Sequence, residues 1–74
     1  MIYDSHVAGK TIRKLRRKKG ISQEVLSGLA EVQRSHLSMI EQGHISASME
    51  TLCRITEALG IRFSDFVRMV EEQK

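Results

Sequence analysis

The chain has 74 residues, of which 41% are hydrophobic and 28% are charged, and its formal net charge is +3. This length allows one domain with a modest core, and this composition argues against disorder. The single cysteine, Cys53, excludes an internal disulfide, no apolar run is long enough to span a membrane, and the N-terminal residues lack a signal-peptide core, so we expect a cytoplasmic protein.

The first predicted helix runs from about residue 5 or 6 to residue 19 and carries most of the positive charge. Ala8, Ile12 and Leu15 recur at helical spacing and form its core stripe. Seven of the twelve basic residues follow one another here without an acidic residue: Lys10, Arg13, Lys14, Arg16, Arg17, Lys18 and Lys19. Such a stretch attracts a polyanion, nucleic acid first, or is a solvated helix face, and charge alone does not separate the two.

Four shorter helices are predicted after residue 20. The second begins at Ser22, a favourable N-cap, the third covers roughly residues 33–42, the fourth starts after Ser48, and the fifth spans about residues 63–72. The residues expected to face the core from the second to the fourth helix are Leu26, Leu29, Ala30, Leu37, Ile40, Leu52, Ile55 and Leu59. Nothing alternates with a period of two, so we predict one all-α domain of five helices over residues 1–74.

The second and third helices predict a helix-turn-helix over about residues 22–42. The turn between them is about three residues long around Glu31 and Val32, and the small side chains of Ser27 and Ala30 allow the helices to approach closely. In this motif the second helix, the reading helix, lies in the major groove of DNA.

The identity and spacing of residues in and around this motif resemble those of the lambda-repressor-like (XRE-type) helix-turn-helix family. The resemblance covers about residues 8–68 and rests on Ile12, Leu15, Arg16, Ile21, Ser22, Gln23, Leu26, Val32, Ser38, Ile40, Glu41 and Gly43, and on the tail Leu52, Ile55, Ala58, Leu59, Gly60 and Ile61. The small size also resembles controller proteins of restriction–modification systems. Two positions depart from the family pattern: Glu31 replaces a turn glycine that takes a positive φ, and Ala47 replaces a proline.

The resemblance implies a five-helix DNA-binding domain that regulates transcription, as a repressor or an activator that also controls its own gene. Base contacts are implied for the exposed side of the reading helix: Arg34, Ser35, Ser38 and Met39. Arg34 is the strongest candidate for a base contact, because its planar guanidinium can donate to guanine O6 and N7 together. The alternative for Arg34 is a phosphate contact.

Phosphate contacts are implied for residues around the reading helix: Gln23, Gln33, His36, Gln42, His44, Ser46 and Ser48. Gln23 is also expected to brace the reading helix, and Gln33 is a poor residue for its N-cap. The family further implies a structural, buried ion pair between Arg16 and Glu41, so that Arg16 does not face the DNA.

The fifth helix has apolar side chains on more than one side, which predicts a homodimer built on Phe63, Phe66, Met69 and Val70. The alternative is that these residues complete the core of the monomer. A two-fold dimer places two reading helices about 34 Å apart on a roughly palindromic operator. The scattered histidines indicate no enzyme and no metal site, and we expect no cofactor and no small-molecule ligand. Two other functions stay open: an antitoxin, and a protein-interaction module that keeps the fold.

Overall fold

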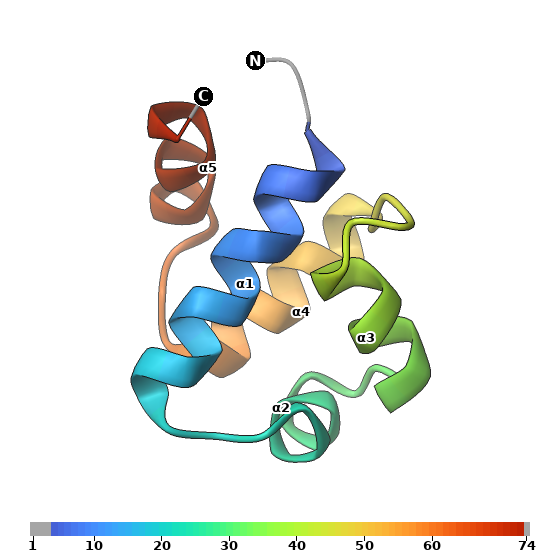
Figure 1. Cartoon of the computed structure of the whole chain (residues 1–74). Helices are drawn as coiled ribbons and strands as arrows, with labels where there is room; N and C mark the ends of the chain where they lie inside the picture. Colours follow the sequence, from blue (N-terminus) through green and yellow to red (C-terminus); the bar gives the residue numbers. More distant parts are fainter. Residues whose placement is uncertain (1–3, 74) are drawn as a thin grey trace.

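The computed structural model describes residues 4–73, which form five α-helices (Figure 1). They are α1 (Ser5–Lys19), α2 (Gln23–Ala30), α3 (Arg34–Glu41), α4 (Met49–Leu59) and α5 (Phe63–Glu72). The all-α prediction is correct: residues 4–73 contain no strand, and each predicted helix boundary lies within one residue of the observed one. Residues 1–3 and 74 of the predicted domain lie outside the described residues. No helix among residues 4–73 has the length and apolar character that crossing a bilayer requires.

The helices begin where side chains can bind free backbone N–H groups. Ser22 Oγ accepts from the Val25 N–H and Ser48 Oγ accepts from the Thr51 N–H, each at 3.1 Å, so both predicted N-caps are confirmed. Asp4 caps α1 in the same way, with one carboxylate oxygen accepting from two N–H groups at 3.0 and 3.1 Å. Each cap satisfies donors that the helix itself cannot, and typically contributes about 1 kcal/mol.

The turn between α2 and α3 is built without glycine. Glu31 ends α2 with a φ of 56°, the single positive value at a non-glycine residue within residues 4–73. The Val32 N–H donates to the Ser27 carbonyl at 3.0 Å and closes the turn. A positive φ at an L-residue costs about 1 kcal/mol, and Gln33 then starts α3 without a side-chain capping bond. The turn therefore keeps its shape at some cost in stability.

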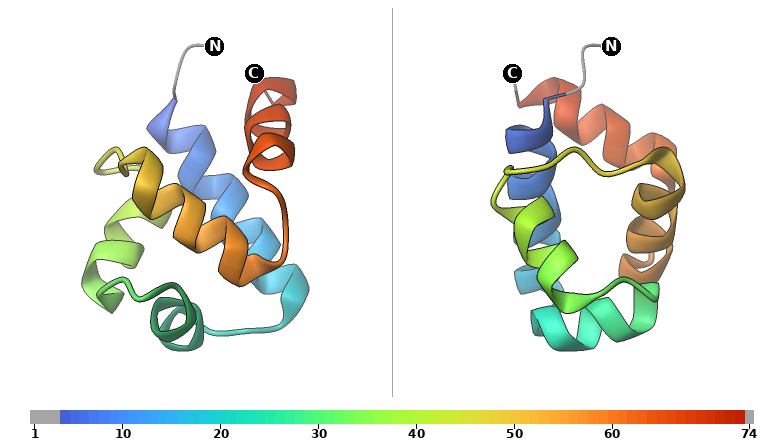
Figure 2. Two further views of the ribbon diagram at one scale, coloured as in Figure 1. Left: turned by 180° about the vertical axis from the view of Figure 1, so that it is seen from behind. Right: turned by 90° about the vertical axis from the view of Figure 1, so that its right-hand side faces the viewer.

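The five helices enclose one hydrophobic core. α1 packs against α3, α4 and α5, while α2 packs against α3 and α4. In Figure 1, α4 crosses behind α1, and the view from behind in Figure 2 shows it in front. The fully buried side chains at the centre include Ile12, Leu26, Leu37, Ile40 and Ile55, all predicted to face the core.

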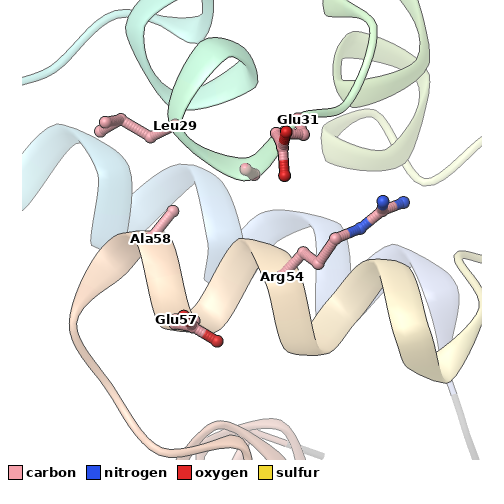
Figure 3. A pocket seen from close by; sticks show the side chains of 6 residues that line it. Leu29, Glu31, Arg54, Glu57 and Ala58 are labelled. Atoms are coloured by element: carbon pink, nitrogen blue, oxygen red, sulfur yellow. The ribbon is translucent and has the colours of Figure 1, made fainter.

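Leu29 was predicted in this core, and that prediction is wrong, because 59% of the residue is exposed. α2 buries Leu26, Ser27 and Ala30. Leu29 lies about 100° around the helix from Ala30, beyond the buried stripe. It borders a hollow of about 200 Å³ between the end of α2 and α4 (Figure 3), which is also lined by Ala30, Glu31, Arg54, Glu57 and Ala58. None of the residues predicted to contact DNA lines this hollow.

The fifth helix completes the core of the monomer. Phe66 and Val70 are 2% and 0% exposed. We predicted both at a dimer interface, and this is wrong, because the packing of α5 against α1 and α4 already encloses their side chains. Phe63, Val67 and Met69 remain half-buried. The apolar surface that α5 offers a partner is therefore smaller than its sequence suggests.

Candidate nucleic-acid interface

The exposed side of α3 carries the residues predicted to contact bases. Arg34 and Ser35 are exposed, Met39 is 42% exposed, and Ser38 is half-buried. The opposite side of the helix is buried in the core. α3 lies at an edge of the molecule in Figure 1 and in the view from behind in Figure 2. A helix placed in this way can enter a major groove about 12 Å wide.

A buried carboxylate fixes the inner side of α3. The Glu41 side chain is fully buried, and that of Arg16 is 10% exposed. Arg16 donates from Nε to Glu41 Oε2 at 2.7 Å and from Nη2 to Glu41 Oε1 at 3.0 Å, and its Nη1 donates to the Ile21 carbonyl at 2.9 Å. The ion pair that the sequence predicts is therefore present, and it joins α1 to α3.

Two more side chains donate to the same carboxylate. Gln23 Nε2 lies 3.1 Å and Arg13 Nε lies 3.4 Å from Glu41 Oε1, so α1, α2 and α3 meet at one buried charge. Gln23 thus braces the reading helix, while the second hydrogen of its Nε2 stays available to a phosphate. The sequence did not predict the hydrogen bond from Arg13 to Glu41, because 28 residues separate the two and no local spacing pairs them.

The ionisation of this cluster follows from its contacts. Burial alone would raise the pKa of Glu41, but hydrogen bonds from Arg16 and Gln23 and the charge of Arg16 hold that pKa below its usual range. The hydrogen bonds to Glu41 raise the pKa of Arg16. Both groups are charged at neutral pH and neutralise each other, so Arg16 contributes little to the field outside the protein.

The residues predicted to bind phosphate lie on α2, on α3 and its N-cap, and in the segment that leads to α4, and some already have partners. Gln42 Nε2 donates to Ser38 Oγ at 3.1 Å, which ties a phosphate candidate to a base-reading candidate. The Ser48 hydroxyl accepts from the Thr51 N–H and donates to Thr51 Oγ1 at 3.0 Å. Because the Ser48 hydroxyl is already paired, an anion near Ser48 would be bound by the free backbone N–H groups at the start of α4. The remaining candidates are accessible: Gln33, His44 and Ser46 are exposed, and His36 is half-buried.

A hollow of about 410 Å³ beside the end of α3 brings α1 to this interface. It is lined by His6, Lys10, Arg13, Glu41, Gln42 and His44. The helices come this close because Gly9 faces the carbonyl oxygens of Ile40 and Glu41, and a Cβ at Gly9 would lie 2.9 Å from the oxygen of Glu41. The sequence shows the positive charge of these α1 residues but not that they border the end of α3, because this proximity depends on tertiary packing.

The titratable side chains do not gather into a metal site: within residues 4–73, no three His, Cys, Asp or Glu side chains are placed to hold an ion together. His6 and His44 share their hollow with the cations Lys10 and Arg13, a setting that suits an anion. Cys53, expected at a core position, is half-buried on α4.

The comparisons with known proteins agree with this geometry. Residues 12–66 match the helix-turn-helix family HTH_3. The uncharacterised HTH-type transcriptional regulator y4dJ of Sinorhizobium fredii is 29% identical over 66 residues, which cover 89% of this chain and 86% of that protein. The control protein C.MunI of a Mycoplasma species is 32% identical over 66 residues, covering 88% of this chain and 89% of that protein.

Among solved structures, the restriction-modification controller protein C.AhdI from Aeromonas hydrophila has a similar fold. It superposes with a TM-score of 0.82 at 32% identity, over 85% of this chain and 96% of that chain.

Proposed function

This chain belongs to the helix-turn-helix family HTH_3, DNA-binding transcriptional regulators that are not enzymes, and from this premise we propose that it binds one specific DNA site as a homodimer. The site is a roughly palindromic operator in double-stranded DNA, read in the major groove. The protein acts on DNA in the cytoplasm, controls its own gene among others, and responds to its own concentration rather than to a small molecule.

The observation that carries this proposal is the free outer side of α3. Within residues 4–73, Arg34 makes no ion pair and no side-chain hydrogen bond, while Glu41 anchors the other side of the same helix. A rigid helix with an uncommitted guanidinium in its first turn suits bidentate recognition of guanine. Ser35 and Met39 lie on the same side, and Met39 can contact a thymine methyl group.

Around this reading side, Gln33, His36, Gln42, His44, Ser46 and the N–H groups at the start of α4 position the DNA backbone. Such contacts fix the orientation of the helix but do not distinguish sequences. The second hydrogen of Gln23 Nε2 adds a contact from α2.

The homodimer uses the part of α5 that the monomer leaves accessible. Phe63, Val67 and Met69 are half-buried, and a second copy would cover the rest of their surface. A monomer that is only 74 residues long buries a modest core, so a shared interface adds stability as well as a second reading helix. Sedimentation velocity at micromolar concentration, with and without operator DNA, tests this: monomer alone in both conditions contradicts the dimer.

The relatives favour a controller role. C.MunI is a control protein and C.AhdI is a restriction-modification controller protein, and both match this chain along most of its length. We therefore propose regulation of a restriction–modification system ahead of the antitoxin function. The uncommitted Arg34 counts against a module that binds only proteins, because such a module does not need it.

Fluorescence anisotropy tests the reading side directly. Wild type, Arg34→Ala and Lys19→Ala are titrated against a duplex from upstream of the gene, or one selected from random DNA, and against a scrambled duplex. Lys19 is an exposed cation at the far end of α1, so its variant removes the same charge away from α3. Wild type should bind the specific duplex about 10³-fold more tightly than the scrambled one.

Arg34→Ala should lose about 5- to 150-fold in affinity, or about 1–3 kcal/mol, on the specific duplex only. Lys19→Ala should behave like wild type on both duplexes. The proposal is wrong if wild type binds both duplexes equally even after unbiased selection. The role of Arg34 is wrong if its variant and that of Lys19 give the same affinities.

A further inference from the structure

The outer face of α1 is a band of positive charge that is largely unpaired within residues 4–73. Lys10, Arg13, Lys14, Arg17 and Lys18 follow the spacing i, i+3, i+4, i+7, i+8, which places them on one side of a helix. Four of them are exposed, and the side chain of Arg13 is 38% exposed. We refer to these five residues as the α1 cationic band. α1 contains no acidic residue.

The exposed cations in the earlier turns of the band bring no stability of their own to the helix. Like charges four residues apart, such as Lys10 and Lys14, destabilise a helix by about 0.2–0.5 kcal/mol per pair. Within residues 4–73, only Arg13 of the band forms an ion pair, and its partner Glu41 is already paired with Arg16. Cations in the last turn stabilise the helix dipole, which accounts for residues 16–19 but not for the cations of the earlier turns.

The position of the band links it to the candidate interface. One hollow joins Lys10 and Arg13 to Gln42 and His44 at the end of α3. A second hollow, of about 540 Å³, continues outward from the same two residues and is lined by Lys10, Arg13, Lys14, Arg17 and Gln73. The positive surface therefore begins at two proposed phosphate contacts and runs along α1 without an exposed carboxylate lining either hollow.

We propose that the α1 cationic band binds backbone phosphates of the same DNA duplex that α3 reads, beyond the phosphates bound by Gln42 and His44. Lys10 and Arg13 make the nearest contacts, and Lys14 and Arg17 extend them along the strand. This inference rests on the proposed function, since α3 must sit in the groove to bring α1 to the backbone. The contacts are independent of base sequence, so they raise affinity and salt dependence but not specificity.

Charge-removing variants of the band test this inference. Lys10→Gln and the double variant Lys10→Gln/Arg17→Gln are compared with Lys19→Gln, which removes a charge from the same helix outside the band. Affinities for the specific and scrambled duplexes are measured by anisotropy between about 50 and 200 mM salt, the range over which phosphate contacts lose most of their strength. Thermal unfolding of each variant reports stability.

Each band substitution should lower the slope of log K against log salt by about 0.9 in magnitude, and should weaken both duplexes by the same factor. The ratio of specific to scrambled affinity should not change. The unfolding midpoint of Lys10→Gln should stay the same or rise, because a repulsion is removed. The double variant also loses the favourable interaction of Arg17 with the helix dipole, so its midpoint should not exceed that of Lys10→Gln. Lys19→Gln should leave the slope unchanged.

The possible failures are distinguishable. If wild type prefers its operator and Lys10→Gln has the slope of Lys19→Gln, the inference is overturned while the proposed function stands. If wild type shows no sequence preference but its salt slope still depends on the band, the operator function fails and the phosphate contacts stand. If the band variants bind less tightly only because they unfold at lower temperature, the band is structural and the inference is overturned.

Discussion

Replacing Arg16 by methionine would leave the Glu41 carboxylate buried without its main partner. Breaking a buried ion pair in this way costs about 3–5 kcal/mol. Gln23 and Arg13 would still donate to Glu41, which favours the lower end, while the Ile21 carbonyl would lose its donor, worth about 1 kcal/mol. We therefore expect a loss of about 3–4 kcal/mol from a domain whose length implies a total of about 4–11 kcal/mol.

Urea and thermal unfolding followed by circular dichroism would measure this loss at one fixed protein concentration, because dimerisation makes stability depend on concentration. A matched control is Arg68→Met, which breaks the exposed Arg68–Asp65 pair on α5, where the atoms are 3.8 Å apart. Exposed pairs contribute about 0–1 kcal/mol, so the control should stay close to wild type. The double variant Arg16→Met/Glu41→Leu should recover most of the loss, because it removes both buried charges.

The pH dependence gives a second, independent signature. In wild type the pKa of Glu41 is lowered, so its contribution to stability is present above the usual pKa of 4.5 and is lost as the pH falls through the lower folded value. In Arg16→Met the hydrogen bonds and the charge of Arg16 no longer oppose burial, so the pKa of Glu41 should be higher than in wild type and acid should neutralise the carboxylate more readily. The stability gap between the two proteins should be widest at pH 7 and should shrink steadily as the pH falls toward about 4.5 and below it. An equal gap at both pH values, or a loss no larger than that of Arg68→Met, refutes this reasoning.

Four further substitutions test the backbone conformation and the capping of the helices. Gly9→Ala places a methyl group against the carbonyls of Ile40 and Glu41 and should cost about 1–3 kcal/mol, whereas Gly28→Ala, at a helical position with nothing within 4 Å, should gain about 0.5–1 kcal/mol; denaturant midpoints that move in the same direction contradict this. Glu31→Gly should relieve the positive φ and stabilise the protein by about 0.5 kcal/mol, measured by thermal unfolding, and a lower midpoint would show that the turn is unstrained. Gln33→Ser should add the missing N-cap of α3 and about 1 kcal/mol, checked by urea unfolding, and no gain would mean that the start of α3 is already satisfied.

The helices and much of the reading side could be predicted from the sequence because their determinants are local. Ser22 and Ser48 cap N–H groups three residues ahead, and this contact depends only on the neighbouring chain. The free side of α3 follows from helical periodicity, since Leu37 and Ile40 turn inward and leave Arg34 and Ser35 outside.

Only the tertiary structure determined which apolar residues of each helix are buried and which residues the charged side chains contact. Leu29 has the residue type and almost the spacing of a core residue, but it borders an open hollow beside α4 and remains 59% exposed. Phe66 and Val70 are spaced like an interface and are buried because α5 lies against α1 and α4. Sequence by itself determined the five helices, their ends and the positive charge of α1. Only the packing decided that Gly9 brings α1 against α3, that Arg13 joins the Glu41 cluster, and that the charge of α1 adjoins the reading helix, because these contacts join residues about 30 positions apart, where no local periodicity acts.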